Sequence, residues 1–308
     1  MINKITVIGS INHDTTLRVD HMPKPGETIH ASEHFTAGGG KGANQAVAAK
    51  RAGAQTAFIG AVGNDAAGNM MLDLLAQEKI DITAVSILDH QSTGQAFITV
   101  DNHGENSIMI HSGANNGFTA EDVKKHAMTI KKSNFIIAQF ESAIESTIEA
   151  FTIARQNGVK TILNPAPALE NVPKDLLAVT DMIIPNEIET EMMTGVKVTN
   201  DVSLKQAADY LHQLGIEAVI ITLGSKGAFY DVNGESGIIP AYKVKAVDTT
   251  AAGDTFIGAL ASLLKKDYSN LVEAIQYGNK ASSITVQRFG AQPSIPFQHE
   301  INERGCKE

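Results

Sequence analysis

A run of small residues at 247–254 (VDTTAAGD) precedes the strongly helical segment TFIGALASLL. Free backbone N–H groups at the start of such a helix form a favourable site for an anion. Asp254 would lie in the first helical turn, where a carboxylate either favours the helix start or acts on a bound ligand. An ordinary cap needs one Ser, Thr or Asp, whereas the tiny residues before Asp254 leave room for a ligand near the backbone. We therefore favour a functional role for Asp254.

The densest glycine cluster of the chain is 38–42 (GGGKG), followed by an amphipathic segment at 43–52. Such a loop lets N–H groups approach an anion closely, although a flexible surface loop is a less favoured alternative. It is not a P-loop, because Gly42 stands where that motif has Ser or Thr. The match of GGGKGA to the dinucleotide fingerprint is weak, since about thirty residues separate it from the first strand. The downstream helix favours a loop aimed at a ligand.

Two further segments place polar residues directly after apolar strands. Residues 186–189 (NEIE) follow MIIP, and residues 222–227 (TLGSKG) follow AVII. Polar residues at the carboxyl ends of strands are positioned for ligand binding in open α/β sheets. The first segment is equally consistent with a helix cap, and the second taken alone favours a simple turn between strands.

The elements that must position these motifs alternate regularly. Continuous apolar runs indicate strands buried on both faces, at 5–8, 56–62, 134–138, 159–163, 181–184 and 218–222. Helical segments are expected at 42–51, 66–77, 120–131, 144–156, 187–194, 203–214, 253–264 and 271–286. A hairpin is expected around the Asn233-Gly234 turn. The pattern predicts a doubly wound α/β fold, with a mostly parallel sheet and helices on both faces.

Two segments, about 13–37 and 92–113, read instead as pairs of antiparallel strands. An isolated hairpin is only marginally stable in water, so we expect the two to pair as a small accessory sheet. Beside the ligand-binding edge of the main sheet, this accessory sheet would form a lid. We therefore expect one domain over 1–308 with a discontinuous β lid.

Composition excludes several classes of protein. The 34 acidic residues against 25 basic ones give a net charge of −9, which argues against a nucleic-acid-binding surface. The single cysteine, Cys306, can form neither an internal disulfide nor a cysteine-based zinc site, which favours a reducing cytoplasm. No apolar run approaches the ~18 residues of a membrane helix, and no signal peptide is predicted. We expect a cytoplasmic protein with no membrane or nucleic-acid partner.

Taken together, the motifs resemble those of the ribokinase (PfkB) family of carbohydrate kinases. AGGGKGANQAVAAKRAGA is similar to the N-terminal signature of the family, and VDTTAAGDTFIGAL to its C-terminal signature. GSINHD, QFE at 139–141, NPAPA at 164–168, PNEIE, TLGSKG and GAQPS follow in the family's order, so the resemblance covers essentially the whole chain. Where the broader family has Gly-Ala-Gly-Asp, Ala251 replaces the first glycine and still supplies an N–H group.

This resemblance implies ATP-dependent phosphorylation of a sugar, with D-ribose phosphorylated at its 5-hydroxyl as the expected reaction. Asp254 would be the base that takes the hydroxyl proton. The backbone N–H groups of Ala251, Ala252, Gly253 and Asp254 would form an anion hole for the transferring γ-phosphoryl group. Positioning and charge stabilisation are the main catalytic needs of phosphoryl transfer.

The other implied positions bind the sugar, the nucleotide and the cations. The sugar would contact Asn12, Asp14, Gly40, Lys41, Asn44, Glu141 and Asp254. ATP would contact Asn186, Thr222, Gly224, Ser225, Lys226, Gly227, Gly253 and Asn279. Mg²⁺ would bridge the phosphates and reach Asn186 and Glu189 largely through water. Potassium would bind at Asp248, Thr250, Thr285, Arg288, Gly290 and Ser294.

Several alternatives stay open. A non-catalytic sugar- or nucleotide-binding protein would not need the Asp254 carboxylate, and an NAD-dependent dehydrogenase has only the misplaced glycine cluster in its favour. Within the family, the substrate could be deoxyribose, fructose or adenosine; the absence of Trp mildly disfavours a base-stacking pocket, although Phe and Tyr also stack. A homodimer through the β lid is expected, because exposed edge strands tend to be covered.

Overall fold

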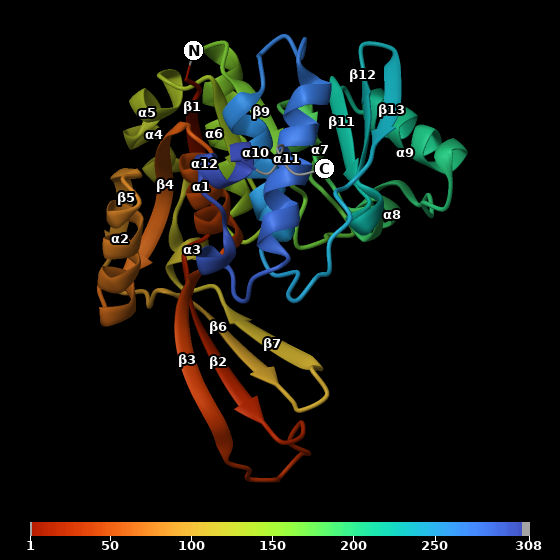
Figure 1. Cartoon of the computed structure of the whole chain (residues 1–308). Coiled ribbons are helices and arrows are strands. Elements are labelled where there is room, and N and C mark those ends of the chain that lie inside the picture. Colours follow the sequence, from red (N-terminus) through yellow and green to blue (C-terminus); the bar gives the residue numbers. More distant parts are fainter. Residues whose placement is uncertain (1, 304–308) are drawn as a thin grey trace.

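The computed structural model describes residues 2–303, so Cys306 lies outside the described residues. A nine-stranded sheet with the order β13-β12-β11-β10-β9-β8-β1-β4-β5 forms the body of the molecule (Figure 1). The parallel strands are β1 (Lys4–Ile8), β4 (Gln55–Gly63), β5 (Asp81–Leu88), β8 (Phe135–Ala138), β9 (Lys160–Leu163), β10 (Met182–Ile183) and β11 (Ala218–Thr222). The predicted hairpin is confirmed as β12 (Ala228–Val232), which pairs antiparallel to β11, and β13 (Glu235–Ile239), which pairs antiparallel to β12.

Helices cover both faces of this sheet, as a doubly wound fold requires. One face packs against α1 (Lys41–Arg51), α2 (Ala66–Gln77), α10 (Ala252–Leu263) and α11 (Leu271–Thr285). The other packs against α3 (Ala114–Gly117), α4 (Ala120–Lys125), α5 (Ala127–Lys131), α6 (Ile144–Gln156), α7 (Lys174–Ala178), α8 (Glu187–Thr194) and α9 (Asp201–Gln213). The short α12 (Gln298–Glu303) places Ile301 against α10 and α11. Nowhere in residues 2–303 does a helix have the length and apolarity needed to cross a bilayer.

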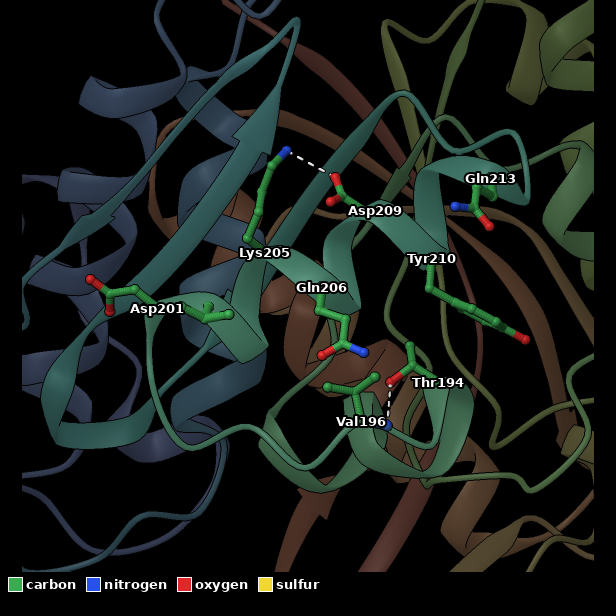
Figure 2. Close-up of a pocket in the computed structure, with 9 residues that line it drawn as sticks. Thr194, Val196, Asp201, Lys205, Gln206, Asp209, Tyr210 and Gln213 are labelled. Carbon is green, nitrogen blue, oxygen red and sulfur yellow. Dashed lines mark hydrogen bonds and ion pairs between the residues drawn. The ribbon is translucent and has the colours of Figure 1, made fainter.

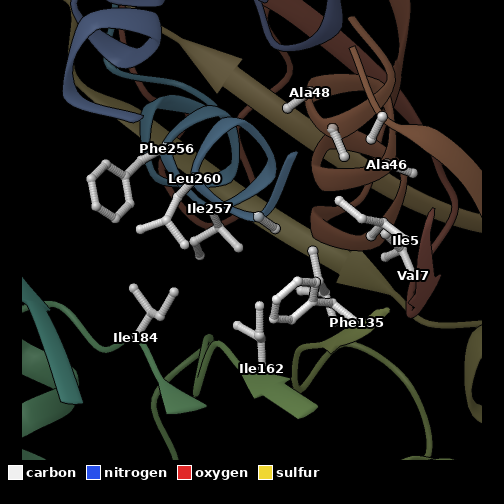
Figure 3. Packing of buried hydrophobic residues seen from close by; sticks show 14 of the residues in the cluster. Ile5, Val7, Ala46, Ala48, Phe135, Ile162, Ile184, Phe256, Ile257 and Leu260 are labelled. Carbon is white, nitrogen blue, oxygen red and sulfur yellow. The ribbon is translucent and has the colours of Figure 1, made fainter. Parts of the chain in front are cut away.

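The strands are buried on both faces, which explains their continuous apolar sequence. Ile5 and Val7 of β1 join the core beneath α1 and α10, whereas Ile8 joins the core on the opposite face. Figure 3 shows the first of these cores, with Phe256 and Leu260 of α10 packed above the sheet. The prediction of a parallel sheet buried between two helix layers is confirmed.

The two irregular segments form one small sheet, with the order β3-β2-β6-β7. Its strands are β2 (Asn12–Val19), β3 (Ala31–Gly39), β6 (Gly94–Val100) and β7 (Asn106–His111). The two hairpins join through parallel pairing of β2 with β6, and each is antiparallel within itself. The expected pairing is therefore confirmed, and the small sheet projects from the body at one end of the main sheet (Figure 1).

The secondary-structure prediction missed the short helices α3, α7 and α12 and was wrong in two larger details. The single helix expected at 120–131 is split into α4 and α5 at His126, whose N–H group donates to the Val123 carbonyl three residues earlier instead of continuing the α-helical ladder. Strand β5 was not predicted, because an edge strand with exposed and buried residues intermixed lacks the continuous apolar run of the inner strands.

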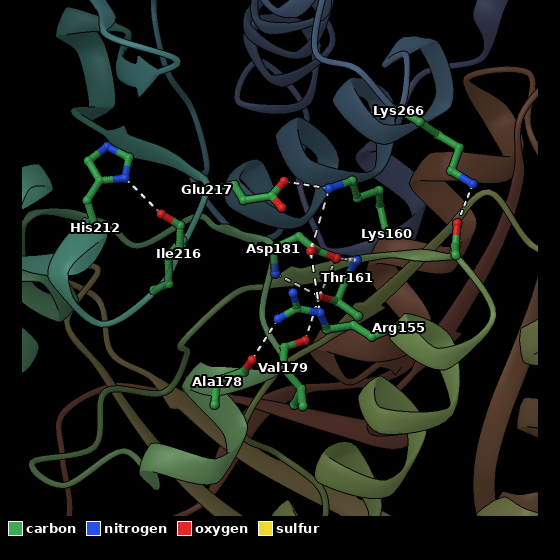
Figure 4. A network of polar contacts seen from close by, with 11 residues as sticks. Arg155, Lys160, Thr161, Ala178, Val179, Asp181, His212, Ile216, Glu217 and Lys266 are labelled. Carbon is green, nitrogen blue, oxygen red and sulfur yellow. Dashed lines mark hydrogen bonds and ion pairs between the residues drawn. The ribbon is translucent and has the colours of Figure 1, made fainter.

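A polar network ties the amino ends of β9 and β10 together, at the edge of the sheet opposite the predicted site (Figure 4). The buried Asp181 carboxylate accepts hydrogen bonds from the N–H and hydroxyl of Thr161 at 2.8 and 3.0 Å. Lys160 Nζ lies 3.6 Å from Asp181 and 2.5 Å from Glu217. Because each buried charge has a partner, this network stabilises the sheet and needs no ligand.

Candidate active site

The site forms at the switch point of the sheet, where the chain order reverses between β1 and β8. Ser10 follows β1 and Glu141 follows β8, and the Ser10 hydroxyl donates to Glu141 Oε2 at 2.6 Å. The N–H group of Lys41, at the start of α1, donates to the same oxygen at 2.9 Å. Ala in place of Gly42 would bring its Cβ to 2.6 Å from the Ser10 nitrogen, so this glycine lets α1 begin against the end of β1.

A cavity of about 560 Å³ opens at this point. Its lining includes every predicted sugar-binding residue: Asn12, Asp14, Gly40, Lys41, Asn44, Glu141 and Asp254. It also includes Asn186, Glu189, Thr222 and residues 249–253, which come from three other segments of the chain. The structure thus brings the N-terminal glycine loop, the C-terminal signature and the ends of four strands around one space.

Asp254 lies in the first turn of α10 and is only 8% exposed. Its Oδ2 accepts a hydrogen bond from Asn44 Nδ2 at 3.0 Å, and its Oδ1 accepts one from Gln45 Nε2 at 2.9 Å. Burial raises the pKa of Asp254, while the Lys41 charge and these two amides oppose the rise. A buried carboxylate held in this way is suited to take a proton from a ligand in the cavity.

The start of α10 is arranged for an anion. No side chain caps this helix within the described structure, and Ala251 precedes it in the left-handed region with φ +58°. The Ala252 N–H group already donates to the Thr249 carbonyl at 3.2 Å, so the predicted anion hole rests mainly on the following N–H groups. A Cβ on Gly253 would meet no protein atom within 4 Å, so the protein itself does not require glycine there. Space for an incoming group explains this glycine.

Two buried oxygen atoms that line the cavity have no hydrogen-bond partner in the described part of the chain. They are Asp14 Oδ1 and Asn44 Oδ1. Burial, and then repulsion from Glu141, raise the pKa of Asp14 to about 7. Since a buried acceptor without a donor is costly, hydroxyl groups of a bound ligand fit these atoms.

Lys41 supplies the positive charge of the cavity. Burial lowers the pKa of Lys41, but attraction to Asp254, Glu141 and Glu189 outweighs this and leaves it above its ordinary value. Lys41 therefore stays protonated and offsets the negative charge of the surrounding carboxylates.

The small sheet covers the cavity with apolar side chains. Ala96 and Ile98 of β6 and Ile108 and Ile110 of β7 line it, and Ile108 and Ile110 are more than half exposed. Exposed isoleucines beside a polar cavity indicate a surface that closes over a ligand.

The predicted nucleotide residues divide between two adjoining cavities. Asn186, Thr222 and Gly253 line the first, whereas Gly224, Ser225 and Asn279 line a second cavity of about 390 Å³ together with Tyr242 and Val244. Thr249 and Ala252 border both cavities, so one elongated ligand can span them at the start of α10.

Lys226 and Gly227 line neither cavity, so their assignment as ATP contacts stays a prediction. Lys226 is exposed, with its Nζ 3.8 Å from Glu187. Gly227 packs against the backbone of residues 239–241, where a Cβ would lie 2.0 Å from the Ile239 oxygen. With φ +109°, Gly227 serves the turn between β11 and β12.

Asn186 and Glu189 form a reciprocal capping box at the start of α8. Asn186 Nδ2 and its backbone N–H donate to the Glu189 carboxylate at 2.9 and 2.8 Å. Burial raises the pKa of Glu189, opposed by the Asn186 hydrogen bond and the Lys41 charge. The helix cap is therefore confirmed, and because it also lines the cavity, the ligand-binding role of this segment stays a prediction.

The predicted potassium residues lie on two adjacent loops. Asp248 Oδ1 accepts from the Thr250 N–H and hydroxyl at 2.9 and 2.6 Å, and Asp248 Oδ2 accepts from the Gly290 N–H at 2.9 Å. Thr285 and Ser294, which flank Arg288 and Gly290 in the sequence, are both buried. The Arg288 side chain instead pairs with Glu300 at 2.5 Å, which leaves only its backbone for a cation. Within residues 2–303 no cluster of three His, Cys, Asp or Glu side chains could hold a metal ion.

Sequence reasoning missed five buried polar residues: Ser10, Gln45, Asn115, Gln139 and Asn164, of which Asn164 lines the cavity and the others lie behind it. All except Asn115 lie within a quoted motif, but burial and partner contacts decide their roles. Asn115 shows this, since its Nδ2 donates to Asn12 Oδ1 at 2.8 Å and its Oδ1 accepts from the Ile11 N–H at 2.9 Å. The only available signal was polar residue type next to a glycine-rich or strand-end motif.

A larger groove of about 790 Å³ lies elsewhere, between α8 and α9 (Figure 2). Lys205, Asp209 and Tyr210 are among its lining residues, and Lys205 Nζ lies 2.9 Å from Asp209. None of the predicted site residues lines it. The chemistry is therefore concentrated in the smaller cavity.

Comparison with known proteins agrees with this geometry. Residues 2–298 match the model of the pfkB family carbohydrate kinases. The chain is 47% identical over 304 residues to a ribokinase of Staphylococcus aureus (strain COL), covering 98% of this chain and 100% of that one. It is 45% identical over 303 residues to a ribokinase of Haemophilus influenzae, covering 98% of each. A solved Arabidopsis thaliana ribokinase complexed with ribose and ATP superposes with a TM-score of 0.92 at 30% identity, covering 100% of both chains. The chain belongs to the pfkB family of carbohydrate kinases.

Proposed function

We propose that the protein transfers the γ-phosphoryl group of ATP to the 5-hydroxyl of D-ribose. The observation that carries this proposal is the placement of Asp254, a buried carboxylate at the uncapped start of α10, in the first cavity and two residues after Ala252, which borders both cavities. The first cavity carries the polar side chains that a sugar needs, and the second suits a nucleotide base. Relatives named ribokinase at 45–47% identity support ribose as the sugar.

In this proposal the ribose lies against Asn12, Asp14 and Asn44. The unpartnered Oδ1 atoms of Asp14 and Asn44 then gain donors from its hydroxyl groups. Its 5-hydroxyl then points to Asp254, which removes the proton as the phosphoryl group transfers. The free N–H groups of Gly253 and Asp254, with Lys41, stabilise the charge on the transferring group. The isoleucines of β6 and β7 exclude water, which suppresses hydrolysis of ATP.

We also propose that Mg²⁺ accompanies the ATP phosphates and reaches Asn186 and Glu189 through water. The capping box already occupies the oxygens of Glu189, which favours a water-mediated contact over direct ligation. Potassium would use Asp248, Thr250 and the backbone oxygens of the 285–294 segment; replacing potassium by sodium should then lower turnover. The negatively charged nucleotide would gain from each of these cations.

A homodimer through the small sheet and a cytoplasmic location complete the proposal. The β7 strand is exposed along its whole length, including Met109 at 64%, and such an edge tends to be covered. A solution mass of twice 32.7 kDa is expected.

A coupled ADP-release assay with ribose, deoxyribose, fructose and adenosine tests the substrate. We expect the highest kcat/KM for ribose, and a preference for fructose or adenosine would refute the assignment. Asp254→Asn keeps the size of the side chain and removes the base, so it should lower kcat by about 10²–10⁴-fold while ATP still binds. Near-normal turnover in this variant would remove Asp254 from its proposed role.

A further inference from the structure

Behind the proposed base lies a chain of buried amides that no role has yet explained. Gln45 follows the sugar-binding Asn44 on α1 and is 0% exposed. Gln139 and Asn164, at the ends of β8 and β9, are also buried. We propose that Gln45 is a positioning residue which, oriented by Gln139, fixes the Asp254 carboxylate in its proton-accepting orientation and charge state. This inference rests on the proposed role of Asp254 as the base.

The contacts run in one line from the core to the base. Gln139 Nε2 donates to Gln45 Oε1 at 2.5 Å. Gln45 Nε2 then donates to Asp254 Oδ1 at 2.9 Å and to Asn164 Oδ1 at 3.1 Å. Asn164 is itself held by donation from its Nδ2 to the Ile184 carbonyl at 3.0 Å. Both the NH₂ group and the oxygen of the Gln45 amide therefore have hydrogen-bond partners.

Chemistry fixes the direction of this chain. An ionised carboxylate only accepts hydrogen bonds, so Gln45 must turn its NH₂ group to Asp254 and its oxygen away. That oxygen needs a donor, which Gln139 supplies. A flipped Gln45 would place its oxygen against the carboxylate and its NH₂ group against the Gln139 amide nitrogen. Asp254 and Gln139 together thus favour one orientation of the Gln45 amide.

The two oxygens of Asp254 have different surroundings. Asn44, on Oδ2, lines the cavity and is available to a ligand, whereas Gln45, on Oδ1, is sealed from solvent. A bound sugar can compete for Asn44 but not for Gln45. The Gln45 contact therefore persists through the reaction and sets the orientation of the carboxylate.

The fold makes specific room for these amides. A Cβ on Gly9 would lie 2.1 Å from Gln139 Oε1, so this glycine, in the GSINHD motif, admits the Gln139 side chain. A Cβ on Gly258 of α10 would lie 2.6 Å from the Ala48 Cβ and 2.7 Å from the Gln45 carbonyl. Glycine at this position therefore lets α10 approach α1 closely enough for Gln45 to reach Asp254. Apolar residues would fill the same space at lower cost, which points to a use for the polar ones.

The charge state of the base depends on the same contact. Burial raises the pKa of Asp254, and the charges that face it are Lys41 on α1, Glu141 after β8 and Glu189 on α8. Loss of the Gln45 donor leaves these three charges in place and removes one interaction that favours the ionised form. The pKa of the base then rises, so the acid limb of kcat/KM moves to higher pH.

The test compares Gln45→Met, Gln139→Leu and the double variant, with Asp254→Asn as the reference for a lost base. We expect Gln45→Met to lower kcat by roughly tenfold to a hundredfold, as for the loss of a hydrogen bond to a charged group. The KM for ribose should change little, and the acid limb of the pH profile should shift upward. Gln139→Leu should produce the same changes to a smaller extent.

Non-additivity separates positioning from packing. Because Gln139 acts only through Gln45, the double variant should be no slower than Gln45→Met alone, whereas two independent packing defects would multiply. Thermal unfolding without ligand confirms that each variant is folded. Suppose that the wild type is active on ribose and Asp254→Asn is inactive. An unchanged pH profile in Gln45→Met would then overturn the role of Gln45 while leaving the proposed function in place. A wild type inactive on ribose, or an active Asp254→Asn, would overturn the proposed function instead.

Discussion

Asp14→Asn should make the ligand-free protein more stable at alkaline pH while weakening sugar binding. The Asp14 carboxyl is buried beside Glu141 with one oxygen unpartnered, and burial followed by this repulsion raises its pKa to about 7 from 3.8. Between these pH values the folded chain keeps a proton that the unfolded chain has lost. The free energy of unfolding therefore falls as the pH rises from about 4 to about 7, and stays low above that.

The interval from 3.8 to about 7 corresponds to a ceiling of about 4 kcal/mol. Because Asp14 is partly exposed to the open cavity, we expect about half of this, roughly 2 kcal/mol, at pH values above the raised pKa. Asparagine keeps the shape of the side chain and cannot ionise, so Asp14→Asn should recover this free energy. For a chain of this size the melting temperature should rise by roughly 3 °C.

The assay is thermal unfolding without sugar at about pH 8 and about pH 5, for wild type, Asp14→Asn and a control. Asp20→Asn is a suitable control, because its carboxylate lies at the end of the same sheet and is 85% exposed. The Asp14 variant should be more stable than wild type at the higher pH, with a smaller difference at the lower pH, and the control should match wild type. Its KM for ribose should rise by roughly tenfold to a hundredfold. A variant no more stable than wild type at the higher pH would refute the reasoning.

Two glycines of α10 give further predictions, one of which concerns turnover and the other the stability of the fold. Gly253→Ala should leave thermal stability unchanged or slightly higher, since its Cβ meets no protein atom, yet turnover should fall at least tenfold because the methyl group enters the phosphoryl site. Normal turnover would argue against an anion hole there. Gly258→Ala should lower the free energy of unfolding by roughly 1–3 kcal/mol, because its Cβ would lie 2.6 Å from the Ala49 nitrogen. Denaturant unfolding measures this, and a fully stable variant would show that α1 and α10 separate easily.

Much of the fold could be predicted from local pattern. Runs such as 135–138 (FIIA) are apolar at every position because both faces are buried, and this alone indicated a parallel sheet between helices. The edge strand β5 and the break at His126 could not be predicted, because partial exposure and a single non-helical residue leave no strong pattern.

The sequence by itself also determined which residue types could do the chemistry. Asp254 after a run of tiny residues, and Lys41 in a glycine loop, were identifiable because a ligand that approaches the backbone demands small residues nearby. Local pattern gave no sign that two residues more than two hundred positions apart share one cavity, and only the family resemblance placed both at the sugar.

Only the tertiary structure decided which polar residues serve the site from behind. Gln45 and Asn44 are adjacent amides in one helix, yet one faces the cavity and the other is sealed against Asp254. Likewise Lys226, which the family resemblance gave as an ATP contact, is exposed and lies beside Glu187. The physical reason is that hydrogen-bond partners and burial depend on segments far apart in the chain, whose approach is set by packing of helices such as α1 against α10.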